Sequence, residues 1–354
     1  MSSRKISWLC FLLGLVLAAP AADAQKNDLN FINHNKPILS AHNCYPYAGK
    51  WNDRVPRALN SGFPVQIEQD LAWYVDPATG KGRVVVSHSN RPTGSEPTLH
   101  DYFFEQVRPV VEKAIAENKR EQWPIIVLMF DFKDNRPDIV KAVWQELGEY
   151  EPWLSTAVKT DDVKNIMPIE RRPIIALAGD SDAQAKVFYD DVPVGDKLRI
   201  FGAAHEASPP ATLSSTDKNR WQATTPPDLL VTDPSNNYRR WTNYSWYPIE
   251  EGGQSKAADW KPANYQRLRA IVDHDHKLGY WVRFYTLDGF AKGGDIGGWG
   301  NGYNFGSHDA VLTRWKAAIA AGVNFVASDQ YEDLATYMKQ NSQDLRPLKD
   351  KTTK

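Results

Sequence analysis

The chain has 354 residues, of which 42% are hydrophobic and 24% are charged, and its formal net charge is -1. This length suits one large domain or a single barrel. The charge balance gives no basic excess for nucleic-acid binding. Beyond the N-terminal segment, no apolar run is long enough to argue for a membrane span.

The N-terminal segment has the features of an export signal. Arg4 and Lys5 precede an apolar run over residues 6–19, and small residues lead up to Ala24. This pattern predicts a signal peptide over residues 1–24, cleaved after Ala24, and a secreted or periplasmic mature chain that starts at Gln25. An uncleaved anchor is the alternative, but the apolar run is short for a bilayer.

The two cysteines do not predict a disulfide. Cys10 lies in the signal segment, so Cys44 is the one cysteine left in the predicted mature chain. Cys44 lies two residues from His42, which raises the possibility of a thiolate nucleophile. Nearby carboxylates would raise the pKa of its thiol, so this interpretation is disfavoured.

Nine apolar runs follow a polar lead-in over residues 25–36. They predict strands over 38–42, 64–73, 84–88, 124–132, 173–178, 197–203, 238–246, 280–287 and 324–329. Helical spacing falls over 55–61, 99–118, 139–148, 264–277 and 308–321. Continuous apolar strands that alternate with helices predict a parallel sheet covered on both faces. We therefore expect a single-domain α/β fold, a (β/α)8 TIM barrel over residues 37–340, before a polar tail over 341–354.

A closed barrel of this type has eight strands, so one of the nine runs is surplus. Only about a dozen residues separate Leu71 from the run over 84–88, which is short for a parallel crossover with a helix. Glycines and a proline lie between them. We therefore expect residues 84–88 to fold back as a β-hairpin arm after strand two.

Titratable residues gather at the ends of the first three runs. The first run ends in His42-Asn43, and the third ends in His88. Glu68 and Asp70 lie two apart on the second run, so a strand points both to the same face. Two like charges on a buried face are costly unless a cation neutralises them. The pattern therefore predicts a metal site with a histidine on either side.

With the run over 124–132 closing on Asp131-x-Lys133, this constellation resembles the PLC-like phosphodiesterase superfamily. That group of barrels includes glycerophosphodiester phosphodiesterases, phosphatidylinositol-specific phospholipases C and spider sphingomyelinase D type enzymes. The segments Val282–Tyr285 and Gly322–Asp329 are most similar to the branch named for altered inheritance of mitochondria. The His42-Asn43 pair resembles the calcium-dependent phospholipases C, whereas glycerophosphodiesterases carry His-Arg there.

The resemblance implies a hydrolase acting on a phosphodiester, either a phospholipid headgroup or a glycerophosphodiester. One divalent cation, Ca²⁺ or Mg²⁺, would be held by metal ligands shared with the family: Glu68, Asp70 and Asp131, with Asn43 as a fourth. His42 and His88 would act as general acid and base, either directly or through a cyclic phosphate. Lys133 would contact a phosphate oxygen, although a structural pair with Asp131 is the alternative.

Further substrate contacts are expected from later strands and loops. Arg283 and Tyr285 lie on one predicted barrel strand. Trp299 lies in the glycine-rich loop over 289–306, which is predicted either to cover the active-site face as a lid or to be an ordinary surface loop. The His274-Asp275-His276 motif lies late on a helix, where residues two apart diverge, and is expected to be solvated surface.

Two other function classes fit parts of the sequence. The 13 tryptophans and the paired acids would suit a carbohydrate-active barrel, but acids two apart on one strand are too close for attack from both faces of a sugar. A non-catalytic binding protein on the same barrel is the other alternative. The presence of both histidines and all three acids argues against it.

Overall fold

Eight parallel strands close into a barrel in the computed structural model, which describes residues 27–34, 36–46, 52–290 and 304–341. β1 pairs with both β2 and β11, and these two pairings close the ring. The predicted TIM barrel is therefore confirmed. Around the ring the strands are β1 (Ile38–Ala41), β2 (Val65–Val75), β4 (Ile126–Phe132), β6 (Ile174–Ala178), β8 (Ile200–Ala203), β9 (Arg239–Tyr244), β10 (Trp281–Phe284) and β11 (Phe325–Ser328).

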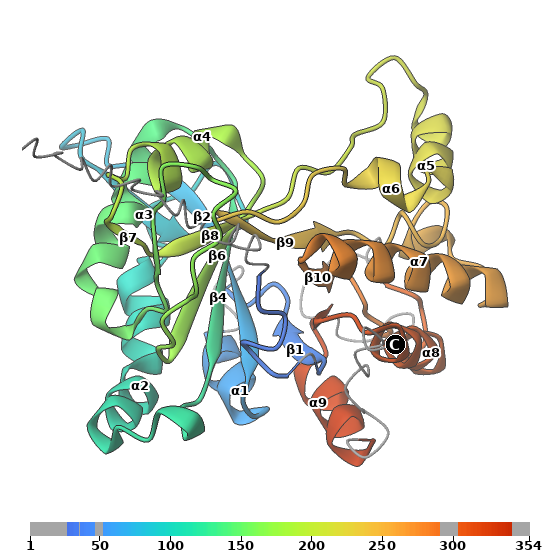
Figure 1. The fold of residues 1–354 in the computed structure, drawn as a ribbon, viewed down its shortest axis with the longest axis horizontal. Helices are drawn as coiled ribbons and strands as arrows, with labels where there is room; N and C mark the ends of the chain where they lie inside the picture. The colour runs from blue at the N-terminus through green and yellow to red at the C-terminus, as the bar shows by residue number, and fades with distance from the viewer. Residues whose placement is uncertain (1–26, 35, 47–51, 291–303, 342–354) are drawn as a thin grey trace, which may run out of the picture.

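Helices surround the strands (Figure 1). They are α1 (Arg54–Asn60), α2 (Glu105–Glu117), α3 (Pro137–Glu149), α4 (Asp182–Ala185), α5 (Ser215–Thr224), α6 (Pro227–Leu230), α7 (Pro262–Leu278), α8 (His308–Ala321) and α9 (Tyr331–Gln340). The outward side chains of the strands and the inward faces of the helices form one apolar core. Within the described ranges, no helix is both long and apolar enough for a membrane span.

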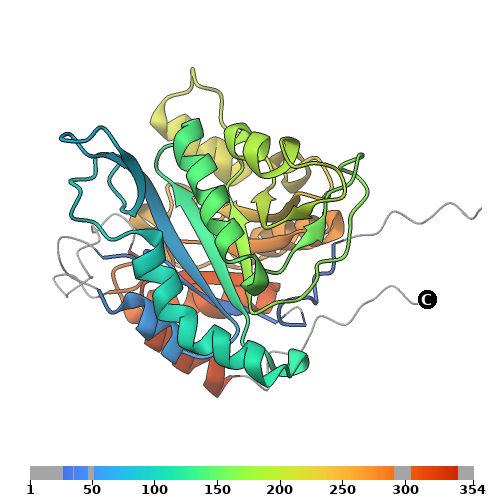
Figure 2. The same ribbon diagram turned by 90° about the vertical axis from the view of Figure 1, so that its left-hand side faces the viewer.

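The surplus strand predicted over residues 84–88 forms a hairpin arm and is not one of the eight barrel strands. β3 (Gly82–Val86) runs antiparallel to the outer half of β2, with Leu71 opposite Val86 and Val75 opposite Gly82. Figure 2 shows β2, in blue, continuing from the barrel toward this arm. The hairpin is thereby confirmed, and it carries His88 to the end of the barrel where the strands finish.

Register explains why polar groups meet inside the barrel. Side chains on a strand alternate between faces, and residues directly paired on neighbouring strands point to the same face. Asp70 pairs with Asp131, and Arg283 pairs with Asn243. Each pair therefore lies side by side at the carboxyl ends of the strands, where barrel sites form.

Several local predictions differ from the structure. The helix expected over 99–118 is a π-helical stretch over His100–Phe104 followed by α2. The helices α4, α5, α6 and α9 fall outside the predicted helical ranges. A small second sheet, of β5 (Ala157–Val158) and β7 (Lys197–Leu198), replaces the beginning of the strand expected over 197–203.

The motif on α7 is not solvated surface, and that prediction was wrong. Asp275 is fully buried and accepts a hydrogen bond from the Thr242 hydroxyl at 2.9 Å. The ring of His276 contacts the Asn324 side chain at 2.8 Å, and that of His274 contacts the carbonyl of Val231 at 2.8 Å. Asp275 is buried because it continues the apolar stripe of α7 formed by Leu268, Ile271 and Val272, at helical spacing.

Candidate active site

The first and last strands of the barrel bring His42 against an acid. Ala41 of β1 pairs with Ser328 of β11, so the residues that follow both strands emerge together. The Nδ1 atom of His42 lies 2.9 Å from Oδ1 of Asp329. Both side chains are buried. The contact fixes the imidazole and leaves Nε2 facing the barrel centre.

The other ring nitrogen of His42 faces Glu68. Nε2 lies 3.7 Å from Oε2 of Glu68, and the ring stacks on Tyr285 with centroids 5.9 Å apart. Burial by itself would lower the pKa of His42. The carboxylates of Glu68 and Asp329 outweigh it and raise the pKa to about 9.

Asn43 turns the chain after β1 by adopting a left-handed backbone conformation, with φ of 52°. Its main-chain N–H donates to Oε2 of Glu68 at 3.0 Å. Its side chain lies against Asp329 at 3.0 Å and accepts from the Tyr45 hydroxyl at 2.6 Å. The structure therefore places the Asn43 carboxamide beside Asp329 and His42.

Glu68 and Arg283 form an ion pair inside the barrel, 3.2 Å apart. Burial would raise the pKa of Glu68, but the charges of Arg283 and His42 lower it to about 2. Arg283 also donates to the Ser40 hydroxyl at 3.1 Å and to Asn243 at 2.8 Å. One face of its guanidinium lies over the Tyr285 ring. The predicted substrate contacts Arg283 and Tyr285 thus lie beside His42.

Asp70, Asp131 and Lys133 form a second charged group. The ammonium of Lys133 lies 2.8 Å from Asp70 and 2.6 Å from Asp131. Burial and the neighbouring Asp131 charge raise the pKa of Asp70 well above its usual value. Lys133 therefore neutralises part of the charge that two adjacent carboxylates create. Its side chain bridges both acids, so it is more than a partner of Asp131 alone.

Three of the four predicted metal ligands, the acids, lie close together, whereas the side chain of Asn43 contacts Asp329 and Tyr45. Single carboxylate oxygens of Glu68, Asp70 and Asp131 all lie within 4.8 Å of one another. Hard oxygen donors at this spacing fit Ca²⁺ or Mg²⁺. The ammonium of Lys133 lies between two of them, so a divalent cation and Lys133 would compete for the same carboxylates.

His88 approaches the same acids from the arm. It follows β3, where Ser87 donates its main-chain N–H to the carbonyl of Asp70 at 2.9 Å. The ring of His88 stacks on Tyr45 with centroids 6.0 Å apart. Burial of the ring and the nearby Lys133 charge lower the pKa of His88. His88 is exposed, whereas His42 is buried.

Sequence reasoning missed Asp329 and Asp288 as members of the site. Oδ1 of Asp288 accepts the main-chain N–H of Asp329 at 2.6 Å and the Ser328 hydroxyl at 2.8 Å. Burial and the Asp329 charge raise the pKa of Asp288 to about 7. Asp329 closes the last predicted strand, and its place at a strand end was the available signal.

Two further predictions concern the loop that contains Trp299 and the thiol of Cys44. Trp299 and most of the loop over 289–306 lie outside the described residues, so the lid stays a prediction. Cys44 is fully buried, and burial raises the pKa of its thiol to about 12. This agrees with the expectation that Cys44 is not a thiolate nucleophile.

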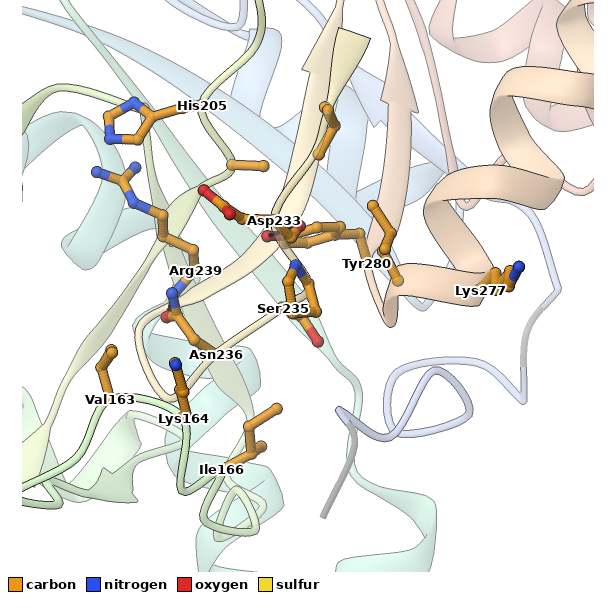
Figure 3. Close-up of a pocket in the computed structure, with 14 residues that line it drawn as sticks. Val163, Lys164, Ile166, His205, Asp233, Ser235, Asn236, Arg239, Lys277 and Tyr280 are labelled. Atoms are coloured by element: carbon orange, nitrogen blue, oxygen red, sulfur yellow. Dashed lines mark hydrogen bonds between the residues drawn. The ribbon is translucent and has the colours of Figure 1, made fainter. Parts of the chain in front are cut away.

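Two cavities differ in their relation to these residues. A cavity of ≈ 270 Å³ includes Asp131, Asn243 and Tyr285 in its lining. A larger cavity of ≈ 530 Å³ is lined by the segment before β9, including Asp233, and by the end of α7 (Figure 3). Its lining includes Arg239 but none of the predicted site residues. The smaller cavity is therefore the one that opens onto the candidate site.

No known family model matches the sequence, and no curated protein matches it. Among solved structures, the chain is similar to a Plasmodium falciparum HPPK-DHPS triple mutant with SDX-DHP, at 12% identity and a TM-score of 0.41 over 89% of this chain and 48% of that one. A second triple mutant, with pteroate, gives 11% identity and a TM-score of 0.44 over 91% and 50%. The chain thus spans about half the length of these structures. Likeness at this level carries no information about substrate or activity.

Proposed function

We propose that this chain is an exported, metal-dependent phosphodiesterase that uses His42 and His88 in acid–base catalysis. The observation that carries the proposal is the setting of His42, held by Asp329 at 2.9 Å through one nitrogen while the other faces Glu68. An acid behind an imidazole fixes its orientation for proton transfer.

Positive charge beside this imidazole suits an anionic substrate. Arg283 and Lys133 lie at the carboxyl ends of the strands, each next to acids of the site. A phosphodiester carries one negative charge and gains more on its phosphoryl oxygens during attack. Fixed cations aimed at that position stabilise the transition state without reorganising.

The reaction needs two proton transfers. One histidine removes the proton of an attacking hydroxyl, which forms a new P–O bond. The other gives a proton to the leaving oxygen as the old P–O bond breaks. The attacker is either water or a neighbouring hydroxyl of the substrate, and the second route passes through a cyclic phosphate. His42 and His88 reach the centre from β1 and from the arm respectively, which suits opposite ends of an in-line displacement.

Glu68, Asp70 and Asp131 are the residues that would hold the cation. When bound, Ca²⁺ or Mg²⁺ would offset charge on the phosphoryl oxygens. Lys133, which contacts two of these carboxylates, would add its ammonium charge beside the substrate phosphate.

A titration with metal and a generic aryl phosphodiester tests the proposal. We expect bis(p-nitrophenyl) phosphate to release p-nitrophenol in the presence of Ca²⁺ or Mg²⁺ but not after chelation. The His42→Ala protein should lose this activity while it still binds metal. A parent protein that hydrolyses no diester with either ion contradicts the proposal.

The rival functions are separated by the same preparation. A carbohydrate-active barrel would release p-nitrophenol from aryl glycosides instead. A pure binding protein would bind metal and hydrolyse neither substrate. Export is tested by sequencing the N-terminus of secreted protein, which should begin at Gln25.

A further inference from the structure

The cavity of ≈ 270 Å³ adjoins the proposed reaction centre. Three residues of the site line this cavity. Asp131 is one of the three converging acids, Asn243 accepts a hydrogen bond from Arg283, and Tyr285 stacks on His42. A group that hangs from a phosphate beside Arg283 therefore points into it. Its volume is at the small end for ligand sites, which suits a headgroup and excludes a whole lipid chain.

The charged side chains that line the cavity are all acidic. Its lining includes Asp131, Asp180 and Glu206, and no lysine, arginine or histidine belongs to the described lining. Asp131 is paired with Lys133, which leaves Asp180 and Glu206 to set the charge. A wall of this kind favours a positively charged group.

Glu206 lacks a cationic partner in the part of the chain that the structure describes. Its carboxylate accepts the main-chain N–H of Asn243 at 3.1 Å. Removal from water raises the pKa of Glu206 well above its usual value. A cation brought beside this carboxylate would stabilise its ionised form.

Gln184 of α4 adds an acceptor that the protein leaves unused. The residue is 3% exposed and lines the same cavity. Its Nε2 donates to Asn135 at 2.6 Å, but Oε1 has no hydrogen-bond partner among the described residues. A buried acceptor without a donor is costly, so a ligand that donates a hydrogen bond to Oε1 of Gln184 would be stabilised here.

We propose that this cavity binds a primary ammonium group, so that the substrate is a phosphodiester of an amino alcohol. This inference rests on the proposed function. A primary ammonium only donates hydrogen bonds, which matches acceptors on Gln184 and Glu206. A quaternary ammonium has no N–H for Gln184 to accept. A polyol would bring oxygens that need donors as well.

Binding of the free headgroup tests the inference without turnover. Calorimetric titration of the whole protein with ethanolamine, choline and myo-inositol should give saturable binding for ethanolamine and the weakest or no binding for the other two. Glu206→Gln and Gln184→Leu should each weaken ethanolamine binding about tenfold, the worth of one hydrogen bond to a charged group. Equal binding of ethanolamine and choline, or a preference for inositol, overturns the inference.

Turnover separates this inference from the proposed function. The parent protein should prefer glycerophosphoethanolamine to glycerophosphocholine and glycerophosphoinositol, and Glu206→Gln should reduce that preference mainly through KM. Glu146→Gln is the matched control, because Glu146 is a similarly half-buried acid on α3 that does not line the cavity. Its variant should keep the preference.

Each failure has a different signature. Hydrolysis of bis(p-nitrophenyl) phosphate with no preference for the ammonium-bearing diester overturns the headgroup assignment alone. Failure to hydrolyse any diester overturns the proposed function. If Gln184→Leu melts well below the parent, Glu206→Gln alone decides the assignment, since its amide keeps the size and shape of the carboxylate.

Discussion

His42 and His88 lie on two sides of the same acids, yet the protein holds them in different ways. On the β1 side, His42 is buried and contacts Asp329 and Glu68. On the arm side, His88 is exposed and stacks on Tyr45. The comparison shows that one imidazole is positioned by closure of the barrel, whereas the other is positioned by a hairpin added to it. The site thus combines a buried half with an exposed half.

The largest expected effect comes from removing either imidazole. His42→Ala and His88→Ala should each lower kcat on an aryl diester by roughly 100- to 10,000-fold, the usual worth of one positioned acid or base. Metal affinity, measured by calorimetry, should change little. The two losses should be strongly non-additive in the double variant, because both groups act in one step.

A diester with a good leaving group would show which histidine variant lacks the general acid. The variant that lacks the general acid should be partly rescued by a diester whose leaving oxygen needs no proton. Rescue of one histidine variant alone is expected. Equal rescue of both, or full activity in either, would contradict the pairing of His42 with His88.

The next largest effect is on stability, and it compares a buried carboxylate, Glu68, with a more exposed one, Asp131. Glu68→Gln leaves Arg283 without its carboxylate inside the barrel, so the free energy of unfolding should fall by about 3–5 kcal/mol. Asp131→Asn is the matched control, since the Asp131 side chain is 44% exposed and its loss should destabilise far less. Chemical denaturation measures both. Similar losses would show that the buried carboxylate of Glu68 contributes no more to stability than the exposed carboxylate of Asp131.

A smaller effect, on metal affinity, is expected from the substitution of Lys133. Lys133→Met removes the ammonium that bridges Asp70 and Asp131, so Ca²⁺ or Mg²⁺ no longer has to displace it. Affinity for the metal should rise by about tenfold, which corresponds to about 1.4 kcal/mol. Lys186→Met serves as a control, because Lys186 is an exposed lysine also paired with an aspartate. Unchanged affinity in Lys133→Met would mean that lysine and metal do not compete.

The smallest effect on turnover should come from a buried acid away from both histidines. Burial raises the pKa of Asp275 to about 7, above its usual 3.8. The folded protein therefore binds this proton more tightly than the unfolded chain, and stability from this group is lost as pH rises from about 4 through 7. Asp275→Asn should remove that loss, by at most about 4 kcal/mol at pH 8, without changing kcat. Melting curves across this range would show it. Parallel curves for parent and variant would contradict it.

The barrel could be predicted from sequence because its strands are continuous apolar runs separated by helices. The arm followed from a connection too short for a parallel crossover, between Leu71 and Val84. Glu68 and Asp70 could be placed on one face because strand alternation is local. In each case the decisive signal lay within a few residues of the feature it predicted.

Other parts of the site depend on contacts that the sequence does not display. Asp329 meets His42 across 287 residues, and only the pairing of the first and last strands brings them together. Lys133 reaches Asp70 because Asp70 pairs in register with Asp131. The role of the Asn43 side chain depends on a positive φ that no spacing rule specifies. Such features follow from closure and register, which are global properties.

The pairing of β1 with β11 also has a consequence for the order of events during synthesis. The ribosome makes Asp329 287 residues after His42, and contacts between such distant residues form late and slowly. Until β11 docks, Nδ1 of His42 lacks its acid and the barrel stays open on that side. A nascent chain that has not yet formed β11 would therefore carry both histidines, Glu68, Asp70 and Asp131 without the contact between His42 and Asp329. The candidate site is completed only when this strand joins the barrel.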